Sequence, residues 1–256
     1  MLEYIDSHAH YDDEQFDSDR DEVLHRVHEG GVRYIVNMGC NLERSRLSVE
    51  YAEKYPFVYA AVGIHPEDVE GTPENYLEQL KNWADNPKVV AIGEIGLDYH
   101  YEGYNADLQK RIFEEQLDLA DRLGLPVVIH SRDATGDTMD ILRSRGKVRG
   151  VMHCFSGSAE TARQVLDLGM NISFTGVLTF KNARKALEAL AVVPLERLML
   201  ETDCPYMAPE PNRGKRCDSG MIVHIINKIA EVKGVTPEAV AKQTMENTLR
   251  LFDRIK

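Results

Sequence analysis

Glu3-Tyr4-Ile5-Asp6-Ser7-His8-Ala9-His10 opens the chain as a short apolar run that leads directly into a His-x-His pair. Side chains alternate across a β-strand, so Asp6, His8 and His10 are expected on one side. Two imidazoles one residue apart can hold a single metal ion, and imidazole suits zinc, nickel, copper and iron. Two surface histidines would give the same pair, so its meaning depends on where the other ligand-type residues fall. Asp6 either orients one imidazole or is an ordinary acid at a strand end.

Beyond this strand, short apolar runs alternate with amphipathic helical patterns to the end of the chain. We expect strands over residues 2–6, 34–38, 58–62, 89–92, 127–129, 151–153, 171–174 and 197–200. We expect helices over residues 19–30, 42–54, 74–84, 106–123, 135–145, 158–169, 183–190, 221–233 and 236–252. This alternation predicts one α/β domain over residues 1–256, a (β/α)8 TIM-type barrel. A doubly wound open sheet uses the same alternation and is the structural alternative.

The composition of the chain limits its partners. The 256 residues contain 30 basic and 42 acidic side chains, a formal net charge of −12. This charge argues against a general nucleic-acid coat or a membrane-surface protein, but it allows an enzyme that holds a nucleic acid end in a local pocket. Four cysteines without a C-x-x-C pair indicate reduced thiols and a cytoplasmic protein. We find no signal-peptide pattern and no apolar run of about 18 residues, so we expect no membrane partner.

Ligand-type residues gather at the C-terminal ends of the predicted strands. The residues concerned are His8, His10, His65, Glu94, His130, His153 and Asp203. In a closed barrel these ends converge on one mouth, where the active sites of this fold lie. Each residue alone could be structural, but their shared position predicts a metal site. Of the remaining histidines, we expect His25 and His28 to be solvated and His224 to be structural, while His100 either touches substrate or has no role.

Six motifs occur in a characteristic order along the chain. They are Asp-Ser-His-Ala-His (6–10), Gly-Ile-His-Pro (63–66), Gly-Glu-Ile-Gly-Leu-Asp-Tyr (93–99), Ile-His-Ser-Arg (129–132), His-Cys-Phe-Ser-Gly (153–157) and Glu-Thr-Asp-Cys-Pro-Tyr (201–206). Through these motifs the chain resembles, over essentially its whole length, the TatD family of metal-dependent deoxyribonucleases in the amidohydrolase superfamily. The resemblance implies a (β/α)8 barrel, a divalent-metal site that is often binuclear, and hydrolysis of phosphodiester bonds in DNA.

The resemblance also implies roles for individual residues. His8, His10 and Asp203 would hold a first metal ion, Glu94 would bridge two ions, and His130 and His153 would hold the second. The ions would be Mg²⁺, Mn²⁺ or Zn²⁺, and two of them could clamp the attacking and leaving oxygens of a phosphoryl transfer and acidify a water molecule. We expect Asp203 and Glu94 to be catalytic, with Asp203 as the general base.

Basic residues could bind the phosphates of a DNA substrate. Arg132, Lys181, Arg213, Lys215 and Arg216 would form a basic lip, or would be ordinary solvated charges. His65 could bind a phosphate oxygen or pack at a helix start.

The chain departs from the family pattern at one place. Cys217-Asp218-Ser219 stands where the family usually has Asn-Glu-Pro, and Asn212 stands where histidine is common. This departure puts substrate contacts from the loop in doubt but leaves the metal site untouched.

The preferred activity is that of an exonuclease on a DNA strand end, with 3′-5′ polarity favoured. One alternative is a related hydrolase that acts on a small ester, lactone or amide. Many such sites bridge two metals with a carboxylated lysine where this chain has Glu94. The other alternative is a non-catalytic metal-binding module. No obligate protein partner is expected.

Overall fold

A closed ring of parallel strands forms the centre of the structure. The computed structural model describes residues 2–256, and in that part of the chain eight strands pair in the order of the sequence. They are β1 (Tyr4–Ala9), β2 (Val32–Met38), β3 (Val58–Val62), β4 (Val89–Asp98), β5 (Val127–Arg132), β6 (Gly150–Met152), β7 (Asn171–Phe174) and β8 (Leu198–Leu200). A doubly wound sheet would reverse its strand order at one point, so the sequential order confirms the barrel.

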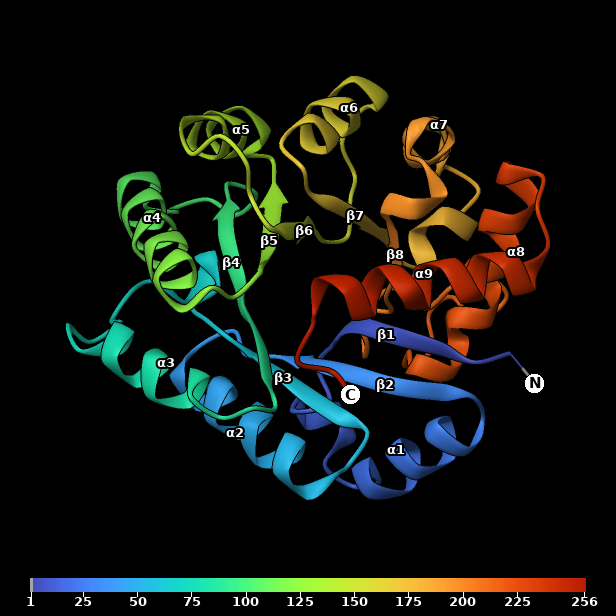
Figure 1. The fold of residues 1–256 in the computed structure, drawn as a ribbon, viewed down its shortest axis with the longest axis horizontal. Coiled ribbons are helices and arrows are strands. Elements are labelled where there is room, and N and C mark those ends of the chain that lie inside the picture. The colour runs from blue at the N-terminus through green and yellow to red at the C-terminus, as the bar shows by residue number, and fades with distance from the viewer. Residues whose placement is uncertain (1) are drawn as a thin grey trace.

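Helices surround this ring (Figure 1). They are α1 (Arg20–Glu29), α2 (Leu42–Lys54), α3 (Tyr76–Ala84), α4 (Ala106–Leu123), α5 (Thr135–Ser144), α6 (Ala159–Asp167), α7 (Arg184–Val192), α8 (Ile222–Lys233) and α9 (Pro237–Leu251). Short 3-10 turns, absent from the sequence-based prediction, are η1 (Glu14–Phe16), η2 (Pro66–Asp68), η3 (Gly176–Thr179), η4 (Leu195–Arg197) and η5 (Ser219–Met221). The apolar stripes of the helices pack on the outer face of the strands, as the periodicity predicts.

The ring closes between β1 and the residues that follow β8. Ala9 and Cys204 form a parallel bridge. The backbone N–H of Asp203 donates to the carbonyl of His8 at 3.0 Å, and that of His10 donates to the carbonyl of Cys204 at 2.8 Å. The last link of the barrel is therefore made by residues that the sequence singles out as metal ligands.

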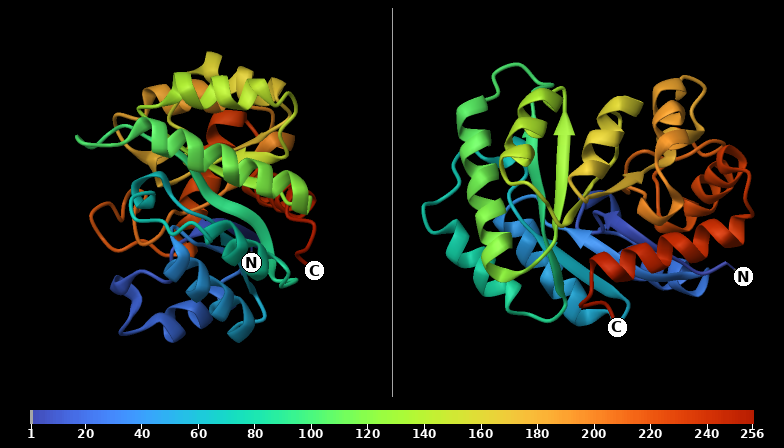
Figure 2. Two further views of the ribbon diagram at one scale, coloured as in Figure 1. Left: turned by 90° about the vertical axis from the view of Figure 1, so that its left-hand side faces the viewer. Right: turned by 45° about the horizontal axis from the view of Figure 1, so that its top comes forward.

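The C-terminal helix closes the opposite end of the barrel. Alternate strand residues that face away from the outer helices form a second apolar cluster, in which Leu251, Phe252 and Ile255 are buried. The Asn247 amide donates to the carbonyls of Leu195 and Leu198 at 2.8 and 2.7 Å, which fixes α9 at the start of β8. Figure 2 (right) shows α9 crossing the ends of the strands remote from the arrowhead of β5. Only the C-terminal ends of the strands are left for a site.

Several predicted boundaries are wrong, and the largest errors lie near the mouth. The strand predicted to end at residue 92 continues to Asp98, and the one predicted to end at 129 continues to Arg132. The first strand runs to Ala9, and β6 ends at Met152, so His153 lies just beyond it. Glycines and polar residues suggest strand ends, but ladder hydrogen bonds use the backbone and continue through them. By contrast, β3, β7, α2 and α4 have the predicted bounds.

An extra residue enters two of the strands that carry the candidate ligands. From Ile92 to Ile95 β4 advances three positions while its partner β5 advances two, from Val127 to Ile129. In β1, the pairing slips in the same way between Asp6 and Ala9. Bulges of this kind bend a strand and re-aim its side chains, and they are common next to active sites. The strict alternation that the sequence suggests is therefore interrupted within β1.

The four cysteines of the described chain are free thiols, as their spacing predicts. Within residues 2–256, no helix combines the length and the apolar character that crossing a membrane would require.

Gly96 allows β4 to approach β5 closely. Its φ is +148°, and a Cβ built there would lie 2.0 Å from the carbonyl oxygen of His130. We predict that Gly96→Ala lowers the free energy of unfolding by roughly 1–3 kcal/mol, because the overpacked backbone must shift. Urea titration measures this loss.

Gly136→Ala is the matched control. A Cβ at Gly136 meets nothing within 4 Å, and Gly136 lies in α5, where alanine is favoured by up to about 1 kcal/mol. Equal stability of the two variants would contradict the close-approach argument.

Candidate metal centre

The carboxylate of Glu94 lies at the centre of the mouth and is buried. Its Oε2 lies 3.3 Å from Nε2 of His8 and 3.7 Å from Nε2 of His10. Its Oε1 lies 2.8 Å from Nε2 of His153 and 2.9 Å from Nδ1 of His130. The two oxygens of one carboxylate thus face two different pairs of imidazoles. The bulge in β4 positions this residue, and the N–H of Glu94 donates to the carbonyl of Gly39 at 3.1 Å.

Asp203 also faces the first pair of imidazoles, those of His8 and His10. Its Oδ1 lies 3.5 Å from Nε2 of His8 and 3.3 Å from Nε2 of His10. The backbone of Asp203 is left-handed, with φ +60°. Asp133, Cys154 and Met207, which also follow barrel strands, share positive φ values. Such backbone strain clusters at functional sites, where the surrounding structure holds it in place.

The geometry brings together all six of the residues that the sequence suggests as ligands. Sets of donor atoms lying within 4.8 Å of one another, and so able to hold a metal ion, are His8, His10 and Glu94; His65, Glu94 and His130; and His8, His153 and Glu201. Nδ1 of His8 is buried and has no hydrogen-bond partner within residues 2–256. Imidazoles with carboxylates are a donor set that divalent transition metals prefer. The residues therefore fit a metal centre, by the chemistry of their donor atoms.

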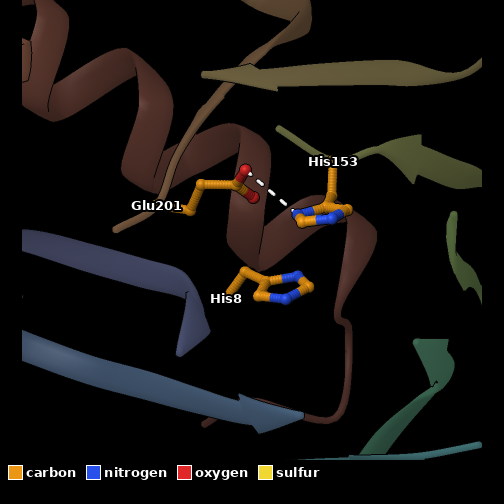
Figure 3. Close-up of side chains that lie close together, drawn as sticks. All are labelled: His8, His153 and Glu201. Atoms are coloured by element: carbon orange, nitrogen blue, oxygen red, sulfur yellow. Dashed lines mark ion pairs between the residues drawn. The ribbon is translucent and has the colours of Figure 1, made fainter. Parts of the chain in front are cut away.

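Glu201 is a member of this cluster that sequence reasoning missed. Figure 3 shows its carboxylate directed at His153, whose ring stacks on His8 with centroids 3.9 Å apart. Its Oε1 lies 3.4 Å from Nδ1 of His153. The carboxylate also accepts from the N–H of Cys154 at 2.6 Å and from Oγ of Ser173 at 2.7 Å. These hydrogen bonds hold Glu201 beside Nδ1 of His153, the ring nitrogen that does not face Glu94, as expected of a carboxylate that orients the imidazole.

Two further side chains contact the imidazole nitrogens of His130 and His10 that do not face Glu94. Oδ2 of Asp98 lies 2.8 Å from Nε2 of His130, and Sγ of Cys40 lies 3.6 Å from Nδ1 of His10. Asp98 and Glu201 stand in motifs quoted above, at or next to the ends of β4 and β8. That position was the one signal that could have identified them.

The electrostatics of the cluster favour the ligand forms of Glu94, His65 and His8, but the protonated form of His153. Burial lowers the pKa of His65 to about 3 and also lowers the pKa of His8. Burial alone would raise the pKa of Glu94, but His153 and the other imidazoles hold it well below its usual range. For His153 the directions are reversed. Burial alone would lower its pKa, but Glu94 and Glu201 raise it well above its usual value. A proton on His153 therefore competes with a metal ion for the same place.

His65 and Asp6 lie beside the cluster in different ways. Nε2 of His65 lies 3.6 Å from Oε1 of Glu94, while its Nδ1 accepts from the N–H of Glu67 at the start of η2. Both proposed roles of His65, at the helix start and at the site, are geometrically possible together. Asp6 instead accepts from the N–H and hydroxyl of Thr202 at 3.0 and 2.6 Å and from the N–H of His8. The suggestion that Asp6 orients an imidazole is wrong, because it contacts the backbone of His8.

Only some residues of the predicted basic lip have a charge that is accessible to a phosphate. The guanidinium of Arg132 lies over the ring of Tyr101 at 5.3 Å. Arg213 and Lys215 are exposed, and the Arg213 guanidinium lies over the ring of Phe180 at 4.4 Å. Lys181 is exposed as well.

Arg216 does not belong to the lip. Its guanidinium forms an ion pair with the carboxylate of Asp19, and this pair neutralises the charge of Arg216.

The loop that departs from the family pattern packs inside the structure. Cys217 and Ser219 are buried, and Oγ of Ser219 lies 2.8 Å from the hydroxyl of Tyr11. Asp218 caps η5 and pairs with Arg26 at 2.9 Å. These contacts are structural and tie the loop to the segment after β1 and to α1.

The other histidines lie apart from these sets. His25 is exposed, as expected, while His28 is half-buried and stacks on Phe57 with centroids 4.0 Å apart, so its predicted solvation is wrong. His224 lies 3.4 Å from the Asn212 amide, and His100 pairs with Asp133 at 2.8 Å.

A barrel with a buried histidine and carboxylate cluster at its C-terminal mouth is typical of metal-dependent hydrolases. The chain belongs to one family of that class: the model of the TatD-related DNase family matches residues 5–253.

Individual proteins support this assignment. The chain is 44% identical over 250 residues to the metal-dependent hydrolase YabD of Bacillus subtilis, covering 97% of this chain and 98% of that one. It is 35% identical over 246 residues to a protein of Cronobacter sakazakii named 3′-5′ ssDNA/RNA exonuclease TatD, covering 93% of both. The crystal structure of the TatD homologue YjjV of Escherichia coli superposes with a TM-score of 0.93 at 33% identity, over 98% of both chains.

The acceptor role of Glu201 generates a stability prediction. Glutamine at this position would keep one oxygen for the N–H of Cys154 and turn its amide N–H₂ toward Oγ of Ser173. The Ser173 hydroxyl could accept from this amide, but its own hydrogen would lose the carboxylate acceptor. We expect Glu201→Gln to lower the free energy of unfolding by about 1–3 kcal/mol, the usual cost of a buried unsatisfied group. Thermal unfolding monitored by circular dichroism measures this loss.

Glu196→Gln serves as the control. Glu196 is exposed in η4, so its change should stay within about 0.5 kcal/mol. The same small effect at Glu201 would show that its hydrogen bonds contribute little.

Proposed function

We propose that the chain is a divalent-metal-dependent deoxyribonuclease that removes nucleotides from a DNA strand end, with 3′-5′ polarity favoured. The observation that carries the proposal is the carboxylate of Glu94 between two pairs of imidazoles, each pair facing one of its oxygens. Membership of the TatD-related DNase family supports phosphodiester hydrolysis. The relative named as a 3′-5′ ssDNA/RNA exonuclease supports the polarity and the single-stranded substrate.

Two divalent ions, Mg²⁺, Mn²⁺ or Zn²⁺, are the proposed cofactors. His8, His10 and Asp203 would hold one ion, and His130 and His153 would hold the other, with Glu94 between them. Bound ions of this kind supply Lewis-acid polarisation of a phosphoryl oxygen and lower the pKa of water. Glu201 and Asp98 would keep the rings of His153 and His130 in the orientation that binding requires.

Asp203 is the proposed general base. Its side chain is 14% exposed, compared with 4% for that of Glu94, so Asp203 is the more accessible carboxylate of the pair. Burial alone would raise its pKa, but the hydrogen bond from His10 and the imidazole charges lower it. A deprotonated carboxylate beside the substrate can orient a water molecule and accept its proton at Oδ2, while Oδ1 faces the imidazoles.

Cations at the mouth are the proposed phosphate contacts. Arg132 follows His130 by two residues in β5, and Arg213 and Lys215 are exposed on the loop after β8. Nε2 of His65 is a further candidate for a phosphate oxygen. On a chain of net charge −12, these groups would confine the attraction for a polyanion to the mouth.

The proposal is tested by hydrolysis of end-labelled single-stranded DNA. Metal-stripped protein should be inactive, and adding back Mg²⁺, Mn²⁺ or Zn²⁺ singly should restore release of mononucleotides from the 3′ end with at least one ion. Glu94→Ala should remain inactive and bind fewer than two ions per chain, measured by plasma mass spectrometry.

Glu196→Ala, an exposed change, should behave as the wild-type chain does. Full metal binding without any DNA cleavage would overturn the nuclease proposal and favour a small ester or amide substrate.

Asp203→Asn tests the proton acceptor. The amide keeps one oxygen toward His8 and His10 but cannot accept a proton, so we expect kcat to fall by about 10²–10⁴-fold. Metal content should stay near that of the wild-type chain. Asp167→Asn, an exposed change in α6, controls for the loss of one negative charge. A turnover close to that of the wild-type chain would remove Asp203 from the role of base.

A further inference from the structure

Exposed aromatic side chains gather at the same end of the barrel as the metal centre. Within residues 2–256, the most exposed large apolar side chains are Tyr101 (57%), Tyr206 (49%), Tyr104 (46%), Val235 (39%) and Met207 (38%). The tyrosines and Met207 lie on the loops that follow β4 and β8. In the strand order β1 to β8 these two loops lie on opposite sides of the mouth, so the exposed rings flank the metal centre, as the edges of an interaction surface would.

Tyr206 is held directly beside the candidate metal ligands. Its backbone N–H donates to the carbonyl of Asp203 at 2.9 Å, and its hydroxyl donates to Oδ2 of Asp13 at 2.7 Å. The ring is therefore fixed at both ends while about half of its surface faces solvent. A ring held in this way loses little conformational entropy when it stacks on a ligand.

The loop after β4 presents two more supported rings. Tyr104 stacks on Tyr99 with centroids 4.5 Å apart and an interplanar angle of 9°. Tyr99 is anchored in turn, because its hydroxyl donates to Oδ2 of Asp137 at 2.8 Å. Tyr101 lies beside the guanidinium of Arg132. This loop begins directly after Asp98, which contacts His130, so it is joined to the metal centre.

Two contacts between a cation and an aromatic ring on these loops and on the loop after β7 favour an aromatic polyanion as the occupant. Arg132 lies against Tyr101, and Arg213 lies against the partly buried Phe180 on the loop after β7. Aromatic faces that alternate with cations are the pattern by which proteins bind single-stranded nucleic acids, the rings stacking on bases and the cations meeting phosphates. Bases within a duplex are already stacked on one another and cannot meet such rings.

We propose that Tyr101, Tyr104 and Tyr206, here named the rim tyrosines, stack on unpaired bases of a single-stranded nucleic acid and so select single strands over duplex. The inference rests on the proposed function, because it assigns the bases of the same substrate whose phosphates would meet the metal centre. The rim tyrosines would recognise the flat face of a base and not the hydrogen-bonding groups on its edge.

Binding without turnover tests this inference. The probes are a fluorescent oligothymidylate with phosphorothioate linkages, which resist hydrolysis, and a matched strand of abasic residues, both measured by anisotropy with Mn²⁺ present. The wild-type chain should bind the abasic strand about tenfold more weakly, as the loss of a base–ring stack predicts. Tyr206→Ala and Tyr101→Ala should each reduce this ratio toward one, because the ring and the base form a double-mutant cycle.

Conservative and distant variants complete the test. Tyr206→Phe keeps the ring and should keep the preference for bases, whereas Val235→Ala removes an exposed apolar side chain that follows α8. Lys233, two residues earlier, contacts the carbonyl of Val193 before β8, which places this control at the opposite end of the barrel. Tyr101 and Tyr104 lie on an exposed loop, so their alanine variants keep the test informative if Tyr206→Ala does not fold.

The outcomes separate the two proposals. Equal affinity of the wild-type chain for both strands, or a base preference that survives every alanine change, would overturn the stacking role. If the wild-type chain prefers the strand with bases but does not cleave DNA, the nuclease proposal is wrong and the stacking role is supported. If the chain cleaves DNA but binds both strands equally, the nuclease proposal is supported and the stacking role is wrong.

Discussion

The closure of the barrel between β1 and the residues after β8 is the constraint on which the rest of the structure depends. The backbone bonds that complete the ring, from Asp203 to His8 and from His10 to Cys204, are made by the same residues whose side chains converge on Glu94. Closing the barrel therefore also brings the candidate metal ligands together. With α9 filling the opposite end, the chain has one mouth and one place for chemistry.

The buried carboxylate of Glu94 explains why this mouth favours a cation. An isolated buried charge is costly, and here imidazoles surround it on both sides. The raised pKa of His153 favours a protonated imidazole, which offsets part of that cost, and a divalent ion would offset more. Behind the imidazoles, Asp98 and Glu201 are themselves held by hydrogen bonds, so the rings have little freedom to turn away. The centre is rigid because its supports are buried in the barrel.

An acidic chain that acts on a polyanion must localise its attraction. The net charge of −12 repels nucleic acid over most of the surface. At the mouth, bound metal ions, a few cations and the rim tyrosines would reverse that balance. Such an arrangement suits a strand end that enters a small pocket better than a duplex that lies along a surface, because contacts are concentrated within one region.

The sequence by itself determined the alternation of strands and helices, and it predicted the barrel and six candidate ligands of the metal centre. Periodicity fixes α2, α4, β3 and β7 to the residue, because burial of one face is a local property of the pattern. Only the tertiary structure decided how the mouth is built. The bulges in β1 and β4, the support of His153 by Glu201, and the capture of Arg216 by Asp19 depend on residues far apart in the chain. No local pattern encodes such contacts, because they form only when the strands close into a ring.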